Sequence, residues 1–473
     1  MNIKVQIIIE NESNDTPIIE EIAHFNRNAL SVENIGLMLQ ESKELLSKLQ
    51  ESVVRHQVEE FIGEQGQCQH CHKKLSRKDS KNIIFRSLFG NVELASPRFY
   101  SCKCNPTEKK SFSPLAITIP EHSAPEFLYL QSKWASLMSY GLTTDILKEI
   151  LPVSANTATV MRNTHKIAHR IETDLGDEQG IYIEGCEYEW EKLSNPEEPI
   201  TVGIDGGYVH ARDGDNRKAG WFEVIVGKSL QENHESKRFG FVNKYDTKSK
   251  RRLYEMLKLQ GLQMNQSITF LSDGGDTVRD IQFYLSPNSE HYLDWFHVTM
   301  RITVIKQMAK GISKNKDMKD IEKEMERIKW FLWHGNVYMA LQVLESLQFD
   351  LEILEFDNPN DKKIRKIFKT VEEFHGYISN NRDFIPNYSD RYYYGEHIST
   401  AFVESTVNEV ISKRMVKKQQ MRWTQKGAHL LLQVRTKTLN GELRSKFSEW
   451  YPGMTDEHSD KLSGTHTDGA AMH

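Results

Sequence analysis

Residues 200–210, ITVGIDGGYVH, and residues 268–275, ITFLSDGG, are the two stretches that decide the fold. Each is a run of apolar and β-branched residues that ends in an aspartate followed by two glycines, Asp205 in the first stretch and Asp273 in the second. Short apolar runs of this kind predict buried β-strands. Because the functional groups of an open α/β sheet gather at strand ends, we expect Asp205 and Asp273 to converge on one site.

The segments around these two stretches predict an α/β domain. Two further strand candidates, 221–230 and 238–245, follow the first stretch, and a helix candidate covers 251–262. After the second stretch the pattern predicts a helix near 277–285 and a short strand, EHYLDW, that ends at Trp295. Three hairpin-like strands, then a helix and further strands alternating with helices, form the order of the ribonuclease H-like fold. We therefore predict an α/β, ribonuclease H-like core.

The length of the chain predicts several domains around this core. At 473 residues the chain is too long for one ordinary core. Residues 296–390 have helical periodicity almost throughout, which predicts an all-helical insertion. The predicted segments are a helical region that follows a short strand-like start (1–62), a zinc-ribbon-like domain (63–120), a helix–turn–helix DNA-binding region (121–185), the first part of the core (198–300), the helical insertion (301–395), the C-terminal helical part of the core (396–450) and a disordered tail (451–473).

Composition limits the class of protein. Hydrophobic residues make up 38% and charged residues 27% of the chain, as in soluble globular proteins, and no window approaches the roughly 20 apolar residues of a membrane span. The amino terminus lacks the pattern of a signal peptide, so we expect a cytoplasmic protein. The net charge of −5 argues against a uniformly basic DNA-coating protein but leaves room for local basic surfaces. The amphipathic stretch 35–61 predicts a helix that packs on its own chain, with a dimer contact as the alternative.

Clustered carboxylates indicate a site for hard divalent cations. Mg²⁺ prefers carboxylate oxygens, and two such ions about 3.5–4 Å apart can activate an attacking oxygen and stabilise a leaving one. A third carboxylate should join Asp205 and Asp273, and the candidate is Glu404 in HISTAFVESTVNEVISKRM. Glu396 and Glu409 are its rivals, and spacing alone does not choose among the three.

A further acid and a histidine follow the last predicted strand. Asp294 and His297 stand three residues apart in LDWFHV, so they share a face if this segment is helical. The pair can then contact a carboxylate or a phosphate at the site. The alternative is structural, with Asp294 as the cap of a packed helix.

The cysteines are concentrated in two close pairs. Pairs with C-x-x-C and C-x-C spacing, separated by a β-like segment, can supply four thiolates to a structural Zn²⁺: Cys68, Cys71, Cys102 and Cys104. His70 or His72 could replace one of these ligands. Cys186 has no partner in sequence, and we expect it to be a buried small residue.

A basic run follows the proposed third carboxylate. Between Ser412 and Lys437 there is no acidic residue, and Trp423 offers an aromatic surface for stacking. We expect this run to hold DNA phosphates near the carboxylates. Its predicted DNA contacts are Lys413, Arg414, Lys417, Lys418, Arg422 and Trp423.

Two other groups of basic residues differ in what they predict. LTTDILKEILP and TATVMRNTHKIAHRIE have the pattern of a helix–turn–helix, and Arg162, Lys166 and Arg170 on the second helix suit contact with DNA. The cluster over 244–252 is better explained as a solvated face.

Four blocks of this sequence resemble a known family. The blocks GIDGGYVHARDG with WFEVIVGKS, FLSDGGDTVRDI, YLDWFHVTMRI and ISTAFVESTVNEVISKRMVKKQQMRWTQKGAHLLLQVRT closely resemble bacterial insertion-sequence transposases of the ISKra group. The resemblance covers about 200–450 strongly and the amino-terminal part more loosely. It implies a DDE catalytic core of ribonuclease H-like fold that cuts the ends of its own element and joins them to target DNA.

The resemblance also implies roles for individual residues. The three carboxylates of the family fall on Asp205, Asp273 and Glu404, so the resemblance selects the glutamate that spacing left open. The family's D-x-x-H motif falls on Asp294 and His297. The expected cofactors are two Mg²⁺ ions, for which Mn²⁺ can substitute, and a structural Zn²⁺. The expected partner is double-stranded DNA, at element ends and at the target, bound by a homodimer or a higher oligomer.

Two other functions remain as alternatives. One is a nuclease or junction resolvase of the same fold, which would cleave DNA without joining a 3′-hydroxyl end. The other is a DNA-binding regulator, in which the zinc ribbon and the helix–turn–helix carry the function and the α/β domain is a scaffold.

Overall fold

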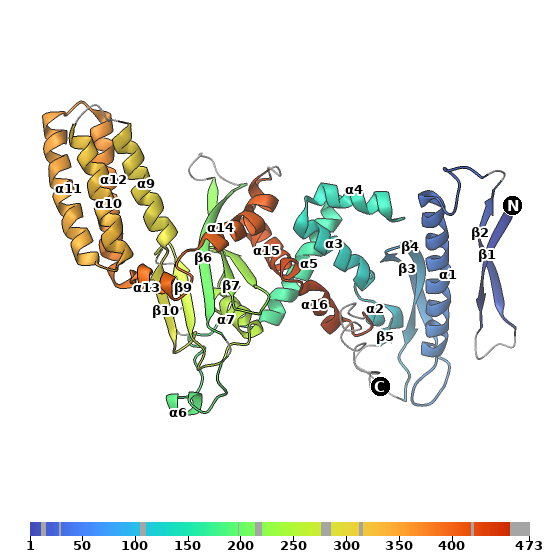
Figure 1. The fold of residues 1–473 in the computed structure, drawn as a ribbon. Helices are drawn as coiled ribbons and strands as arrows, with labels where there is room; N and C mark the ends of the chain where they lie inside the picture. Colours follow the sequence, from blue (N-terminus) through green and yellow to red (C-terminus); the bar gives the residue numbers. More distant parts are fainter. Residues whose placement is uncertain are drawn as a thin grey trace, which may run out of the picture. The chain divides into compact units, whose positions relative to one another are not determined.

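The computed structural model describes residues 1–10, 16–27, 30–104, 110–196, 198–212, 220–275, 285–311, 316–417 and 421–454, apart from the side chains of 316–319. Contacts within the chain define two compact units, Met1–Ile167 with Gly441–His473, and Ala168–Asn440. Figure 1 labels the elements of both units. Residues 276–284 and 455–473, which carry the predicted helix near 277–285 and the predicted disordered tail, lie outside the described ranges. No helix in these ranges is long and apolar enough to cross a membrane.

The first unit contains two small antiparallel sheets and a group of helices. Its elements are β1 (Asn2–Ile9), β2 (Ile18–Asn26), α1 (Leu39–Gln65), β3 (Arg77–Ser87), β4 (Gly90–Tyr100), β5 (Ser111–Phe112), α2 (Pro114–Thr118), α3 (Pro125–Leu137), α4 (Tyr140–Ile150), the first part of α5 (Thr157–Leu175) and α16 (Leu443–Trp450). Helix α1 packs on β4 through Val54, Val92 and Leu94. The predicted helix, turn and second helix are present as α4 and α5; a DNA-binding role for them stays a prediction.

The amino-terminal segment differs from the predicted helical region over 1–62. After β1 the chain forms a second strand, β2, which pairs with β1 in an antiparallel hairpin. Ile22 and Phe25 of β2 are both buried although they lie three residues apart, because the pairing register shifts between Val5 and Gln6. Apolar residues at three-residue spacing are typical of a helix, so this bulge hid the strand from sequence reasoning.

A five-stranded mixed sheet forms the centre of the second unit. Its order is β10-β9-β6-β7-β8, with β6, β7 and β8 antiparallel and with β9 and β10 parallel to β6. The strands are β6 (Ile200–His210), β7 (Trp221–Leu230), β8 (Arg238–Val242), β9 (Ile268–Ser272) and β10 (Ser289–Leu293). All five predicted strands are confirmed, and the α/β class with them. The ribonuclease H-like assignment stays a prediction.

Helices cover both faces of this sheet. Helix α7 (Ser249–Leu259) packs on one face, where Leu253 meets Ile204 and Phe241 in a buried core. The other face carries α14 (Ala401–Val407), a π-helical segment η2 (Asn408–Val416) and α15 (Gln425–Leu439). Helix α14 approaches β6 so closely that a Cβ atom at Gly203 would lie 2.1 Å from Val403. A larger residue at position 203 would therefore push α14 off the sheet.

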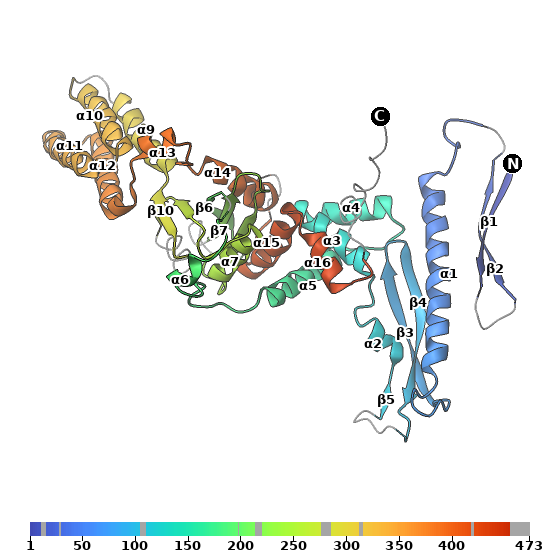
Figure 2. The same ribbon diagram turned by 60° about the horizontal axis from the view of Figure 1, so that its bottom comes forward.

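An all-helical segment lies between β10 and α14, as predicted. It consists of α9 (Trp295–Lys310), α10 (Lys316–Trp333), α11 (Val337–Asp357), α12 (Lys362–Asn380), the short η1 (Arg382–Phe384) and α13 (Tyr388–Tyr393). Helices α9 to α12 lie side by side in a bundle with its own apolar core (Figures 1 and 2). The buried hydroxyl of Tyr388 donates a 2.7 Å hydrogen bond to the carbonyl of Leu293 and fastens the segment to the end of β10. The second unit also contains the end of α5 and the short helix α6 (Glu187–Trp190).

Candidate active site

The parallel register of β6 and β9 brings Asp205 and Asp273 to the same level of the sheet. In the register of β6 and β9, Gly203 lies opposite Leu271. Asp205 and Asp273 each lie two residues further along the chain. Neighbouring strands lie about 4.8 Å apart. The two aspartates predicted from sequence to converge therefore lie side by side on adjacent strands. Asp273 directly follows the end of β9, whereas Asp205 lies in the middle of β6, which continues to His210. The prediction that Asp205 ends its strand is wrong, because the two glycines after it stay in the sheet.

Asp205 and Asp273 also face the same side of the sheet, the side of α14 and η2. Alternate residues of a strand share a face. A Cβ at Gly203 would meet Val403, and a Cβ at Gly207 would lie 2.9 Å from Ile411, so Asp205 between them points toward α14 and η2. On β9, Phe270 faces the opposite core against α7, which leaves Asp273, three residues on, on the side of Asp205.

Asp205 is held where its charged form is disfavoured. Burial raises the pKa of its carboxyl, and the negative charges of Asp273 and Asp294 raise it further. A 2.7 Å hydrogen bond from the backbone N–H of Gly206 and the nearby His297 act in the opposite direction. The net shift is upward, which indicates negative charge that the protein does not itself neutralise.

Asp273 is exposed and is braced from the helical segment. Its side chain accepts a 3.0 Å hydrogen bond from the N–H of Gly275, and its backbone carbonyl accepts a 3.0 Å hydrogen bond from the Tyr377 hydroxyl on α12. The next residue, Gly274, has a φ of +86° and lies against Asn381, where a Cβ would be 2.5 Å from the amide oxygen. Only glycine fits this turn, so the end of α12 fixes the direction in which Asp273 leaves β9.

Asp294 has a structural role. It is fully buried and caps α9 by accepting a 2.8 Å hydrogen bond from the N–H of Phe296. It also accepts hydrogen bonds from the N–H of Thr400, at 3.0 Å, and from the Thr400 hydroxyl. His297 Nε2 lies 3.6 Å from Asp294 Oδ2. Asp294 thus caps α9, as the structural alternative expected, and a catalytic role for Asp294 and His297 stays a prediction.

The bond between Asp294 and Thr400 brings α14 to this end of the sheet. Thr400 precedes the first residue of α14, and Glu404 lies one turn later, its N–H donating to the Thr400 carbonyl at 3.0 Å. The Glu404 side chain is exposed. In the described part of the chain, no hydrogen bond or ion pair joins it to Asp205 or Asp273. Its place as the third carboxylate therefore stays a prediction, although its helix is packed on the correct strand.

The two rivals of Glu404 are engaged elsewhere. The Glu409 carboxylate forms an ion pair with Arg238 and accepts a 2.9 Å hydrogen bond from its Nε. Glu396 is paired with Arg391, which also contacts Tyr292 at the outer strand of the sheet. A carboxylate already neutralised by arginine is a poorer ligand for a divalent ion.

The four predicted cysteines come together in the first unit. Their Sγ atoms lie within 4.8 Å of one another, with 3.4 Å between Cys68 and Cys104 and 3.5 Å between Cys71 and Cys102. A tetrahedral Zn²⁺ with bonds of about 2.3 Å separates its sulfurs by about 3.8 Å, so the group fits zinc. His70 and His72 are exposed and lie outside the group, which favours four cysteine ligands.

The backbone around Cys68 is arranged to stabilise a thiolate. Hydrogen bonds from the N–H groups of Cys71 and His70 are the main cause that lowers the pKa of Cys68 to about 6. Thiol contacts with Cys102, Cys68 and Cys71 raise the pKa of Cys104 instead. The cysteines of the group therefore differ in how readily they lose their protons. A divalent cation bound by all four sulfurs would favour the thiolate form of each cysteine.

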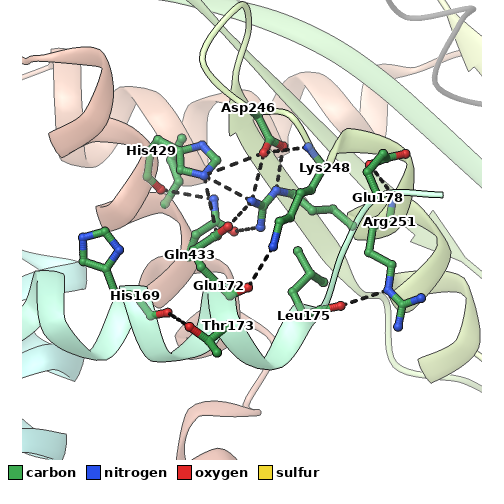
Figure 3. A network of polar contacts seen from close by, with 12 residues as sticks. His169, Glu172, Thr173, Leu175, Glu178, Asp246, Lys248, Arg251, His429 and Gln433 are labelled. Atoms are coloured by element: carbon green, nitrogen blue, oxygen red, sulfur yellow. Dashed lines mark hydrogen bonds and ion pairs between the residues drawn. The ribbon is translucent and has the colours of Figure 1, made fainter.

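A second cluster of metal-ligating residue types, which Figure 3 labels as Glu172, Asp246 and His429, lies between α5, α7 and α15. Glu172, Asp246 and His429 have ligand atoms within 4.8 Å of one another. The guanidinium of Arg252 lies between them, with Nη2 2.6 Å from Glu172 and Nε 2.7 Å from Asp246, and Nη1 donates to Gln433 at 2.7 Å. Burial opposes the charge of Glu172, but His429 and Arg252 outweigh it and lower its pKa to about 2. Arg252 supplies the positive charge here, so the cluster is structural.

The structure corrects two predicted DNA contacts. Arg414 is 0% exposed and Trp423 is 4% exposed. The guanidinium carbon of Arg414 lies 5.1 Å from the Trp423 ring centroid, and the backbone of Trp423 pairs with His210 and Arg212 beside the end of β6. Both side chains belong to the core, so the prediction that they contact DNA is wrong. Sequence reasoning erred because a basic run on a helix was taken as wholly exposed.

The other predicted DNA contacts are surface residues or lie outside the described ranges. Lys413, Lys417 and Arg422 are exposed, whereas Lys418 lies outside the described residues. On α5, Arg162 is exposed and Lys166 forms a 2.9 Å ion pair with Glu121. Arg170 is half-buried. Their contact with DNA stays a prediction.

Two further expectations from sequence are wrong. Cys186 is exposed at the start of α6 instead of buried. Arg252, assigned to a solvated face, is 6% exposed. It stands one helical turn before the buried Met256, so the periodicity of α7 could have flagged it. The brace from Tyr377 and the bond of Thr400 to Asp294 were missed because each joins residues about one hundred positions apart.

Comparisons with known proteins add little to this geometry. No family model matches the chain, and no curated protein matches it. The Drosophila P element transposase strand transfer complex is similar with a TM-score of 0.30 and 10% identity, covering 70% of this chain and 97% of that chain. The crystal structure of NurA is similar with a TM-score of 0.10 and 13% identity, covering 54% and 74%. At such TM-scores neither likeness carries an argument about fold or function.

Proposed function

We propose that this chain is a DNA transposase that cleaves and joins DNA strands with divalent metal ions held by Asp205, Asp273 and Glu404. The observation that carries the proposal is the alignment of Asp205 and Asp273 at the same level of the adjacent parallel strands β6 and β9, on one face of the sheet. The sequence resemblance to ISKra-group transposases gives the same three residues. The strand order, three antiparallel strands followed by two parallel ones, supports a ribonuclease H-like core.

The carboxylates of Asp205 and Asp273 fit a divalent cation. The raised pKa of Asp205, caused by burial and by the charges of Asp273 and Asp294, is the condition that a bound cation relieves. Asp205 and Asp273 would hold the ions together, and Glu404 would complete the site from α14. Two bound Mg²⁺ ions supply charge stabilisation for the attacking and leaving oxygens of a phosphodiester.

The chain's own residues position this chemistry. Tyr377 and Asn381 fix the turn after β9 and so direct Asp273. The bond of Asp294 to Thr400 fixes the start of α14 and with it the turn that carries Glu404. A water molecule, and then a 3′-hydroxyl, would attack the phosphodiester in line, without a covalent protein–DNA intermediate. The exposed Lys413, Lys417 and Arg422 would hold flanking phosphates.

A plasmid cleavage assay tests this proposal. The substrate is a supercoiled plasmid that carries the DNA on both sides of this gene, incubated with Mg²⁺ or Mn²⁺. Asp205→Asn and Asp273→Asn should each lower the cleavage rate about 100-fold or more while DNA binding is retained. Asp350→Asn, an exposed position on α11, should cleave like the wild type. Cleavage that survives Asp205→Asn or Asp273→Asn would remove that residue from the site.

A nuclease without joining activity is the second candidate, because the same carboxylates would serve it. The joining of a 3′-hydroxyl end to a second DNA separates the two functions. A DNA-binding regulator, the remaining alternative, predicts no cleavage at all.

A further inference from the structure

Arg301 lies on the second turn of α9, the helix that starts beside the candidate carboxylate site. Helix α9 starts directly after Asp294, and Arg301 stands one turn after His297, so the two side chains share a face. The charge of His297 acts on Asp205. Arg301 therefore projects from the helical face that borders the carboxylate site.

The guanidinium of Arg301 is held by an aromatic ring that is tied to Asp273. Its central carbon lies 4.0 Å from the centroid of the Tyr377 ring, a close cation–π contact. The hydroxyl of the same tyrosine donates the 3.0 Å hydrogen bond to the Asp273 carbonyl. One side chain thus links the arginine to the candidate metal ligand.

Arg301 differs from the other arginines around the sheet in its charge partners. Arg238, Arg252 and Arg391 each form an ion pair with a carboxylate. Arg301 is exposed, and within the described ranges no carboxylate lies within ion-pair distance of it. Besides the ring contact, Arg301 donates a hydrogen bond to the Tyr377 side chain. A guanidinium has five N–H donors, so others remain to donate to an oxyanion while the ring fixes its plane.

We propose that Arg301 binds a non-bridging phosphate oxygen of the DNA strand held at Asp205 and Asp273, and that Tyr377 is the positioning residue that sets its place. The proposal rests on the function proposed above, and it gives a role to a residue for which the sequence alone indicated none. The phosphodiester is the oxyanion that a planar guanidinium binds through two parallel hydrogen bonds. The positive charge of Arg301 would also reduce the electrostatic repulsion between the DNA phosphates and the acidic site.

The test measures cleavage and binding with a charge-neutral substrate. Arg301→Ala should lower kcat/KM for cleavage about 10- to 100-fold, which is the loss expected when hydrogen bonds to a charged group are removed. Arg301→Lys should restore part of that loss, because it keeps the charge without the planar fork. Arg327→Ala is the matched control, since Arg327 also lies over an aromatic ring, Phe331, but is exposed on α10 and paired with Glu324.

Binding is measured with Ca²⁺, which supports binding without cleavage. Replacing the phosphate at the cleaved position by a neutral methylphosphonate should weaken binding about tenfold for the wild type and hardly at all for Arg301→Ala. Tyr377→Phe should lower kcat with little change in KM, because it keeps the ring under Arg301 but releases Asp273. Thermal melting shows that each variant is folded.

The outcomes separate this proposal from the proposed function. A wild-type protein that does not cleave DNA contradicts the proposed function. A wild type that cleaves, with Arg301→Ala cleaving equally well, overturns the role of Arg301 alone. Equal sensitivity of wild type and Arg301→Ala to the methylphosphonate overturns it as well.

Discussion

Asp205 is a carboxyl group whose surroundings favour the protonated form. Its raised pKa has burial as the main cause, followed by the charges of Asp273 and Asp294. A carboxyl whose pKa is raised on folding contributes stability at low pH and loses that contribution as pH rises from its ordinary value of 3.8 through the raised one. At neutral pH, Asp205 therefore opposes folding unless a cation is bound.

This leads to a prediction about thermal stability. Without divalent ions at pH 7.5, Asp205→Asn should melt at the same temperature as the wild type or above it, because the substitution removes the buried charge. Added Mg²⁺ should raise the melting temperature of the wild type but not of Asp205→Asn. Asp246→Asn is the contrasting control and should melt lower under all conditions, because Asp246 is paired with Arg252. A wild type that Mg²⁺ does not stabilise would contradict this assignment.

Glu404 is the residue whose assignment is least constrained by the structure. Glu404→Gln should abolish metal-dependent cleavage, whereas Glu409→Gln and Glu396→Gln should retain it. Glu409→Gln should in addition lower the melting temperature, because Arg238 loses its partner. Loss of cleavage in Glu409→Gln at an unchanged melting temperature, with Glu404→Gln active, would transfer the role to Glu409.

The difference between these residues shows what sequence can predict at this scale. An apolar strand pattern before Asp-Gly-Gly is a local signal, so Asp205 and Asp273 could be found from sequence. The same pattern did not show that β6 continues past Asp205 to His210. Glu404 could not be found in this way, because which helical glutamate faces the sheet depends on how Val403 packs against Gly203, some two hundred residues away. Only the family resemblance distinguished it from its rivals.

At the scale of elements, the cysteine group joins the turn after α1 to the end of β4. The first unit has a small apolar core, in which Val54 of α1 meets Val92 and Leu94 of β4. A bound Zn²⁺ would add a cross-link between segments that such a core holds weakly.

The prediction is one Zn²⁺ per chain, lost on substitution of any ligand. Elemental analysis of purified protein should give about one zinc for the wild type and for His72→Ala, and much less for Cys71→Ser. Removal of zinc by a chelator should increase amide hydrogen exchange in β3 and β4 but leave β6 and β9 protected. Full zinc content in Cys71→Ser would rule out the four-cysteine site.

The buried network around Arg252 fastens α5, α7 and α15 together. Removing one partner of a buried, hydrogen-bonded ion pair leaves an uncompensated charge and costs about 3–5 kcal/mol. Arg252→Ala should lower the free energy of unfolding by roughly that amount. Arg251→Ala is the neighbouring control, since Arg251 forms an i,i+4 pair with Glu255, and it should lose about 1 kcal/mol or less. Similar losses of unfolding free energy in both variants would contradict the claim that the buried network contributes more than an ordinary surface ion pair.

The same network should contribute less to the stability of the protein at low pH. The pKa of Glu172 is lowered from 4.5 to about 2, against the effect of burial, by His429 and Arg252. A lowered carboxyl pKa gives stability that is complete above its unfolded value and is lost as pH falls from about 4.5 toward 2. Glu172→Gln should therefore flatten the decline of stability below pH 4.5, as measured by denaturant unfolding across that range. An unchanged pH profile would contradict the role of Glu172.

At the scale of the whole molecule, periodicity predicted the second unit better than the first. Strands β6 to β9 are apolar and largely buried, so each carries its own signal in the sequence. The amino-terminal hairpin was missed because a bulge imposed helix-like spacing on Ile22 and Phe25. The mutual placement of Asp294, Thr400 and Tyr377 could not be predicted, because it depends on contacts across the helical segment.

The central claim is that Asp205 and Asp273 act together on a phosphodiester in a reaction that ends in strand joining. The most direct measurement incubates the protein and Mg²⁺ with a target plasmid and a labelled oligonucleotide that matches the DNA flanking the gene and ends in a free 3′-hydroxyl. The account predicts that label becomes covalently joined to the plasmid with wild-type protein, and that Asp205→Asn and Asp273→Asn join none while still binding the oligonucleotide. Cleavage without joining would indicate a nuclease, and joining that persists in Asp205→Asn would contradict the account.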